Sequence, residues 1–107
     1  MKLMTRELEE RFAEVGNQSP NLDPLVIAKF FNQEGSAVTW YATEYNKDTQ
    51  FFYGYVTGYI YAEWKYFSLQ ELENLKLPRG LKIQRDEQFI EDKLSKVLKN
   101  QFLNNGY

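Results

Sequence analysis

The stretch from Ala37 to Phe67 reads AVTWYATEYNKDTQFFYGYVTGYIYAEWKYF, and it decides the fold. Two runs within it, residues 37–45 and 51–57, are rich in β-branched and aromatic residues, which suit a pleated and half-buried surface. The polar residues between them have turn composition, so the two runs are predicted to pair as a β-hairpin. A third run, residues 59–67, follows Gly58, and the three together predict an antiparallel meander.

A helix is predicted before this stretch. Leu8, Phe12 and Val15 recur at intervals of four and three, which places them on one stripe of a helix. Thr5 fits the N-cap of that helix, and Gly16 fits its C-terminal stop.

Four further elements are expected around the meander. Residues 25–31 form a compact apolar run that favours a strand, with a short helix as the alternative, and residues 81–85 alternate as a short edge strand would. Ser68 and Glu71 have the spacing of a capping box, which predicts a short helix directly after the meander. A C-terminal helix is expected with Asp92 as a candidate cap and an apolar stripe of Ile90, Leu94, Val97, Leu98 and Phe102.

The order of these elements predicts one α+β domain over residues 1–107, with residues 104–107 as a frayed tail. Its expected architecture is an antiparallel β-meander of four to five strands, with the N- and C-terminal helices packed on one face and a short helix after the meander. A five-residue hairpin loop would place Ala42 opposite Gly54. These two small residues leave a trough for a helix or a ligand, and helix packing is the simpler interpretation. Trp40, on the same face as Ala42, is expected in the core.

Composition excludes many kinds of chemistry. The 107 residues include no Cys and no His. Disulfides, thiolate nucleophiles, imidazole acid–base catalysis and the usual zinc sites are therefore excluded. The net charge of −2 gives no positive field that would attract nucleic acid or an anionic membrane. With neither a signal-peptide pattern nor an apolar run of about 18 residues, we expect a cytoplasmic protein without membrane contact, cofactor or metal.

Aromatic residues make up 17% of the chain, and many of them lie in the meander. Regular alternation would place Tyr41, Tyr45, Tyr53 and Tyr55 on one face of the sheet. Such a face could stabilise a half-exposed sheet, bind a protein, or stack the bases of single-stranded nucleic acid. Nucleic acid is disfavoured because residues 37–67 contain two lysines against three acidic residues.

A second candidate is a set of charged residues, namely Lys29, Glu44, Glu63, Arg85 and Asp86. Glu44 is expected on the same sheet face as Trp40. In the simpler interpretation Arg85 forms a structural ion pair with Glu44 or Glu63, because a guanidinium suits a carboxylate. In the alternative, Glu44, Glu63 and Asp86 hold a divalent cation or act as an acid–base pair.

The segments TRELEERFAEVG, DPLVIAKFF, TWYATEY, FFYGYVTG, YFSLQELENL and GLKIQRD, in this order, resemble a bacterial family. It is the domain-of-unknown-function family number 2958, and the resemblance covers about residues 3–94. It implies a small protein of plasmids, integrated elements or phages, and no assigned activity. Its most specific pieces are Trp40-Tyr41-Ala42-Thr43-Glu44, Tyr66-Phe67-Ser68-Leu69 and Arg85-Asp86.

These observations favour a non-enzymatic accessory protein of a mobile genetic element, such as an anti-defence or inhibitor protein. It would bind another protein through the aromatic sheet face. The alternative is a metal-dependent enzyme that uses Glu44, Glu63 and Asp86, and the second alternative is a single-stranded nucleic-acid binder that uses the tyrosine face. The exposed Tyr-rich edge also leaves a homodimer open.

Overall fold

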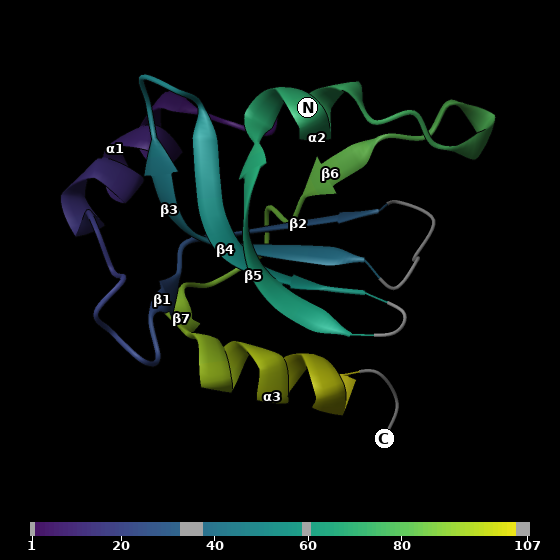
Figure 1. The fold of residues 1–107 in the computed structure, drawn as a ribbon. Coiled ribbons are helices and arrows are strands. Elements are labelled where there is room, and N and C mark those ends of the chain that lie inside the picture. Colours follow the sequence, from purple (N-terminus) through teal and green to yellow (C-terminus); the bar gives the residue numbers. More distant parts are fainter. Residues whose placement is uncertain (1, 33–37, 59–60, 105–107) are drawn as a thin grey trace.

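An antiparallel sheet in the order β5-β4-β3-β2-β6 forms the centre of the molecule (Figure 1). The computed structural model describes residues 2–32, 38–58 and 61–104, apart from the side chains of 102–104. The predicted α+β class with an antiparallel sheet is confirmed. Three predicted features lie outside the described residues: the turn at 33–36, residues 37 and 59–60 of two strands, and the tail beyond 104. The strands of this sheet are β2 (Ala28–Asn32), β3 (Thr39–Asn46), β4 (Phe51–Thr57), β5 (Ala62–Ser68) and β6 (Ile83–Arg85).

The remaining elements lie around this sheet. The first predicted strand is interrupted at Ile27, so that β1 (Leu25–Val26) leaves the sheet and pairs with β7 (Asp92–Lys93). None of the helices in the described parts of the chain has the length and apolar character of a membrane span. The helices are α1 (Arg6–Val15), α2 (Leu69–Asn74), the 3-10 turn η1 (Pro78–Gly80) and α3 (Leu94–Asn104).

The predicted caps of two helices are confirmed. The Leu8 N–H donates to the Thr5 hydroxyl oxygen at 3.1 Å, and Gly16 ends α1 with a φ of 71°, which a residue with a side chain rarely adopts. At the start of α2, the Glu71 N–H donates to the Ser68 hydroxyl oxygen at 2.9 Å.

The predicted register of the hairpin is confirmed only as far as Ala42, because the loop has four residues (47–50) rather than five and the pairing shifts by one residue beyond Ala42. Ala42 lies opposite Gly54, and Trp40 lies opposite Val56. Residues of this face, which we call the Phe52 face, form the main core, and α1 covers them with Phe12. Ala42 is fully buried in the same core as Phe12. Trp40 is half-buried at the margin of this core rather than at its centre.

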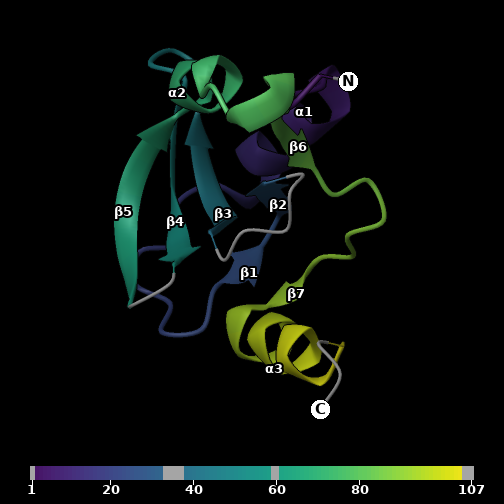
Figure 2. The ribbon, with the colours of Figure 1, turned by 90° about the vertical axis from the view of Figure 1, so that its right-hand side faces the viewer.

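The two terminal helices lie on opposite faces of the sheet, so their expected packing on one face is wrong. Leu94 and Val97 of α3 form a second core with Tyr41, which points away from the Phe52 face. We call this second side the Tyr41 face. The pairing of β1 with β7 explains the difference, because it holds the chain at the other side of the sheet just before α3 begins (Figure 2).

The helix α3 begins four residues later than Ile90, which is 83% exposed and lies outside it. Asp92 does not cap this helix, because it is extended in β7. Asp23 does so instead: it accepts hydrogen bonds from the Ser95 N–H at 2.9 Å and from the Ser95 hydroxyl at 2.6 Å. The loop before β1 therefore fixes the start of α3.

This cap predicts a pH dependence. The hydrogen bonds from the Ser95 hydroxyl and amide lower the pKa of Asp23 below its ordinary value. A carboxylate with a lowered pKa stabilises the fold above its unfolded-state pKa, and this contribution is lost as the pH falls through the folded-state value. Between about pH 6 and about pH 2, thermal unfolding should therefore show a smaller loss of stability for Asp23→Asn than for the wild type.

Asp48→Asn provides the matched control, because Asp48 is exposed in the turn between β3 and β4. It should lose stability on acidification as the wild type does. Equal acid slopes for Asp23→Asn and the wild type would contradict the cap.

Candidate functional site

A β-bulge in β3 decides which side chains reach the candidate site. The pairing with β4 shifts between Ala42 and Glu44, so that Glu44 lies opposite Tyr53 and Tyr45 opposite Phe52. Thr43 is the inserted residue, and its hydroxyl donates to the Tyr53 carbonyl oxygen at 3.1 Å. One inserted residue reverses the alternation beyond it. Tyr45 therefore lies on the Phe52 face and Glu44 on the Tyr41 face, and both predicted placements are wrong.

The four predicted tyrosines consequently have three different environments. Tyr41 is 1% exposed beneath α3, and burial raises the pKa of its phenol to about 12. Tyr45 packs against Phe12 and Phe52, and burial, together with nearby acidic side chains, raises its pKa. Tyr53 and Tyr55 are half-buried on the Tyr41 face, so only these two can take part in a binding surface there.

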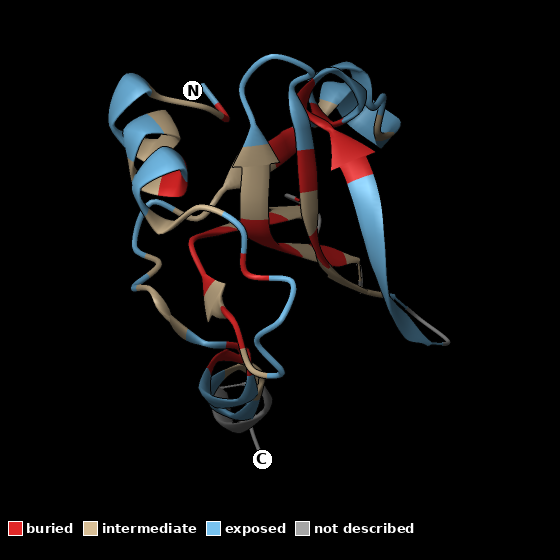
Figure 3. Cartoon of the chain, turned by 60° about the vertical axis from the view of Figure 1, so that its left-hand side comes forward, coloured by how far each residue is buried: buried red, intermediate tan, exposed pale blue. Residues whose placement is uncertain are grey.

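Two residues of β5 complete an aromatic surface that the sequence analysis did not single out. Trp64 lies opposite Tyr55, and Tyr66 lies opposite Tyr53. The ring of Tyr53 lies 5.6 Å from that of Trp64 and 4.7 Å from that of Tyr66, measured between centroids. Trp64 is 38% exposed and Tyr66 69% exposed, on the edge strand that Figure 3 shows as exposed along most of its length. We call Tyr53, Tyr55, Trp64 and Tyr66 the aromatic patch.

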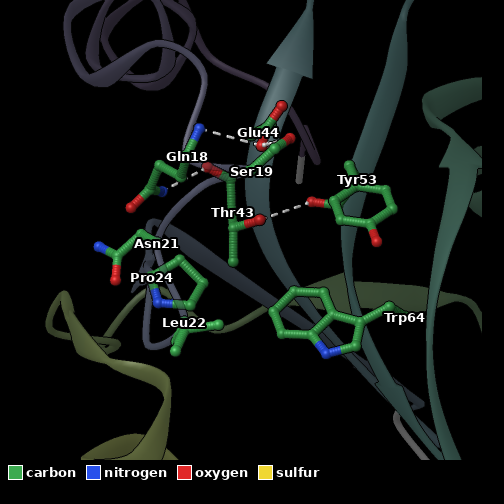
Figure 4. Close-up of a pocket in the computed structure, with 9 residues that line it drawn as sticks. All are labelled: Gln18, Ser19, Asn21, Leu22, Pro24, Thr43, Glu44, Tyr53 and Trp64. Carbon is green, nitrogen blue, oxygen red and sulfur yellow. Dashed lines mark hydrogen bonds between the residues drawn. The ribbon is translucent and has the colours of Figure 1, made fainter.

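A pocket of about 210 Å³ adjoins this patch (Figure 4). Its aromatic wall is formed by Tyr53 and Trp64. The loop between α1 and β1 forms the facing wall, where Leu22 and Pro24 lie. Glu44 lines the pocket from β3, and we call this the Glu44 pocket.

Gln18 holds the loop wall in place. Its side chain is 8% exposed, and its amide nitrogen donates to the carbonyl oxygens of Thr43 at 2.8 Å and Leu25 at 2.9 Å. Its amide oxygen accepts from the Leu25 N–H at 2.7 Å. The Gln18 N–H and the Ser19 hydroxyl also donate to one carboxylate oxygen of Glu44, at 3.0 Å and 3.2 Å. No sequence pattern identified Gln18, because a single amide in a loop has no periodic signal.

The structure does not gather the five predicted charged residues. Lys29 and Asp86 lie together, with 3.8 Å between the ammonium and the carboxylate. Glu63 instead pairs with Lys65 on the same strand at 3.9 Å. In the described ranges, no three acidic side chains lie close enough to hold a metal ion.

The expected pairing of Arg85 with Glu44 or Glu63 is wrong. Arg85 lies in β6 and Glu63 in β5, which are the two opposite edges of the sheet. Arg85 pairs with Phe30 and so belongs to the Phe52 face, whereas Glu44 belongs to the Tyr41 face. The guanidinium instead donates to the carbonyl oxygen of Lys2 at 3.4 Å.

Comparison with known proteins adds a family. The family model described as protein of unknown function (DUF2958) matches residues 3–101. The chain belongs to this family. No curated protein and no solved structure matches the chain significantly.

This site of the DUF2958 chain combines aromatic, apolar and acidic groups. It offers aromatic faces, two apolar side chains of the loop, and one carboxylate with a fixed position. Among the residues that the structure describes, those that line the Glu44 pocket include no Lys and no Arg. Such a surface is complementary to a partner that presents apolar and basic groups.

Proposed function

We propose that the protein is a non-enzymatic binding protein that docks a protein partner with apolar and basic side chains on the aromatic patch. One observation carries this proposal: the rings of Trp64 and Tyr66 are exposed and both contact the ring of Tyr53. These rings lie on the Tyr41 face, beside the part that α3 covers. Tyrosine and tryptophan are enriched among the residues that dominate binding energy at protein interfaces. The resemblance adds a mobile-element setting, in which the protein would be an accessory or inhibitor of its partner.

The other two functions receive less support from the geometry. Stacking of nucleic-acid bases needs cations for the phosphates, and Lys65 of β5 lies on the opposite face from Trp64 and Tyr66. A carboxylate-dependent enzyme needs acidic groups that converge on one site. Glu44 and Glu63 do not converge, because they lie on opposite faces of the sheet.

The test compares two double variants of β5. Trp64→Ser with Tyr66→Ser removes the exposed rings, and Glu63→Ser with Lys65→Ser changes the opposite face of the same strand. A partner captured by the wild type should first be identified and purified. Its affinity should then fall by roughly 30-fold or more for the aromatic variant and remain nearly unchanged for the control.

Three outcomes would contradict the proposal. The aromatic variant could bind the purified partner as tightly as the wild type does. The wild type could bind a single-stranded oligonucleotide through the same two rings. Sedimentation could show a wild-type dimer that the aromatic variant lacks, which would assign the patch to a second copy of this chain.

A further inference from the structure

We propose that the Glu44 pocket binds the guanidinium group of an arginine side chain from the partner protein. This inference rests on the proposed function and names the chemistry by which that partner is recognised. A guanidinium stacks on aromatic faces and also donates paired hydrogen bonds to a carboxylate. The Glu44 pocket presents both kinds of group, because Trp64 and Glu44 line the same cavity.

The apolar walls suit the flat cation and its aliphatic stem. Figure 4 shows the indole of Trp64 across the pocket from Leu22 and Pro24. A cation over an indole face is attracted by the ring, and more strongly where water is excluded. The pocket volume of about 210 Å³ is large enough for the end of one long side chain.

The carboxylate of Glu44 supplies the negative charge. It is half-buried, and one of its oxygens accepts the hydrogen bonds from Gln18 and Ser19. No Lys or Arg within the described ranges forms an ion pair with it. The second oxygen of Glu44 therefore remains available to a guanidinium donor.

The pocket is already ordered before a ligand binds. The buried amide of Gln18 connects the loop wall to β3 and to the start of β1 through three hydrogen bonds. Trp64 in turn is fixed by its contacts with Tyr53 and with Tyr55, whose ring centroid lies 5.2 Å away. The Gln18 side chain and the ring of Trp64 thus lose little conformational freedom on binding, which favours affinity, whereas the Leu22 side chain is fully exposed.

The two tryptophans allow a direct test by NMR. Trp64 lines the pocket, whereas Trp40 lies on the Phe52 face and serves as an internal reference. N-acetyl-arginine amide should shift the indole N–H signal of Trp64 in a saturable way and leave that of Trp40 in place. N-acetyl-lysine amide should bind at least about threefold more weakly than the arginine probe. The neutral isostere N-acetyl-citrulline amide should not bind.

Glu44→Gln should lower the affinity for the arginine probe by about tenfold, because the substitution removes the negative charge. It retains an oxygen that can accept the hydrogen bonds from Gln18 and Ser19. Glu63→Gln, on the opposite face, is the matched control and should leave binding unchanged. Citrulline binding equal to that of arginine, lysine binding as tightly as arginine, or an unaffected Glu44→Gln variant would each overturn the assignment.

The variant Tyr66→Ser separates this inference from the proposed function, because Tyr66 belongs to the aromatic patch and does not line the Glu44 pocket. This variant should bind the partner protein more weakly than the wild type does, and it should bind the arginine probe with unchanged affinity. If the partner depends on the patch but no probe binds, the guanidinium assignment fails and the proposed function stands. If the probe binds but the partner does not depend on the patch, the proposed function fails.

Discussion

Phe52→Ala is expected to reduce the free energy of unfolding by about 3–5 kcal/mol. Phe52 is fully buried, and truncation would leave a cavity that the surrounding rings cannot fill without moving. The total free energy of unfolding of a native domain is about 5–15 kcal/mol. The variant should therefore unfold at a much lower urea concentration than the wild type. The ring centroids around Phe52 are those of Tyr45 at 4.7 Å, Phe30 and Phe67 at 5.2 Å, and Phe12 at 5.8 Å.

Phe51→Ala is the matched control for this experiment. Phe51 precedes Phe52 in β4, points to the opposite face and is 41% exposed. Its replacement should change stability by less than about 1 kcal/mol. Similar losses for both variants would mean that β4 does not bury the alternate residues that the structure assigns to the core.

The parts of the fold that were predicted correctly depend on local rules. A period of two predicts the strands β3 and β4, and the residue types at Thr5, Gly16 and Ser68 determine helix ends. The start of α3 depends instead on pairing between Leu25 and Lys93, which are far apart in the sequence. Helical periodicity at Ile90 therefore extended the predicted helix into a segment that tertiary contacts hold extended.

The candidate site was predicted less well because it depends on the bulge and on a loop. Alternation assigned Tyr45 to the wrong face, since nothing in the residue types around Thr43 indicates an inserted residue. The charged set failed for another reason: the order of strands, which separates Arg85 from Glu63, is not encoded in either strand alone. Only half of the predicted tyrosine face, Tyr53 and Tyr55, remains in the aromatic patch.

Gly54→Ala is expected to be the second severe variant, although it adds a single methyl group. A Cβ atom at Gly54 would overlap the carbonyl oxygen of Tyr41 and would lie 2.9 Å from the Cα of Ala42. Both obstacles are backbone atoms of the paired strand, so no side-chain rotation relieves the clash. We expect a loss of about 3 kcal/mol or more in urea unfolding, at the upper end for overpacking.

Gly58→Ala separates this clash from the general effect of replacing glycine. A Cβ atom at Gly58 would meet only the Tyr61 carbonyl oxygen, at an ordinary 3.5 Å. Both variants restrict the unfolded chain equally, so the difference between them measures the approach of β3 to β4. Gly58→Ala should change stability by less than about 1 kcal/mol, and equal midpoints for the two variants would contradict this close approach. Gly54 lies opposite Ala42, just before the bulge, so a displacement of β3 should also shift Glu44. Gly54→Ala should therefore lower the affinity for the arginine probe under conditions where the variant still folds.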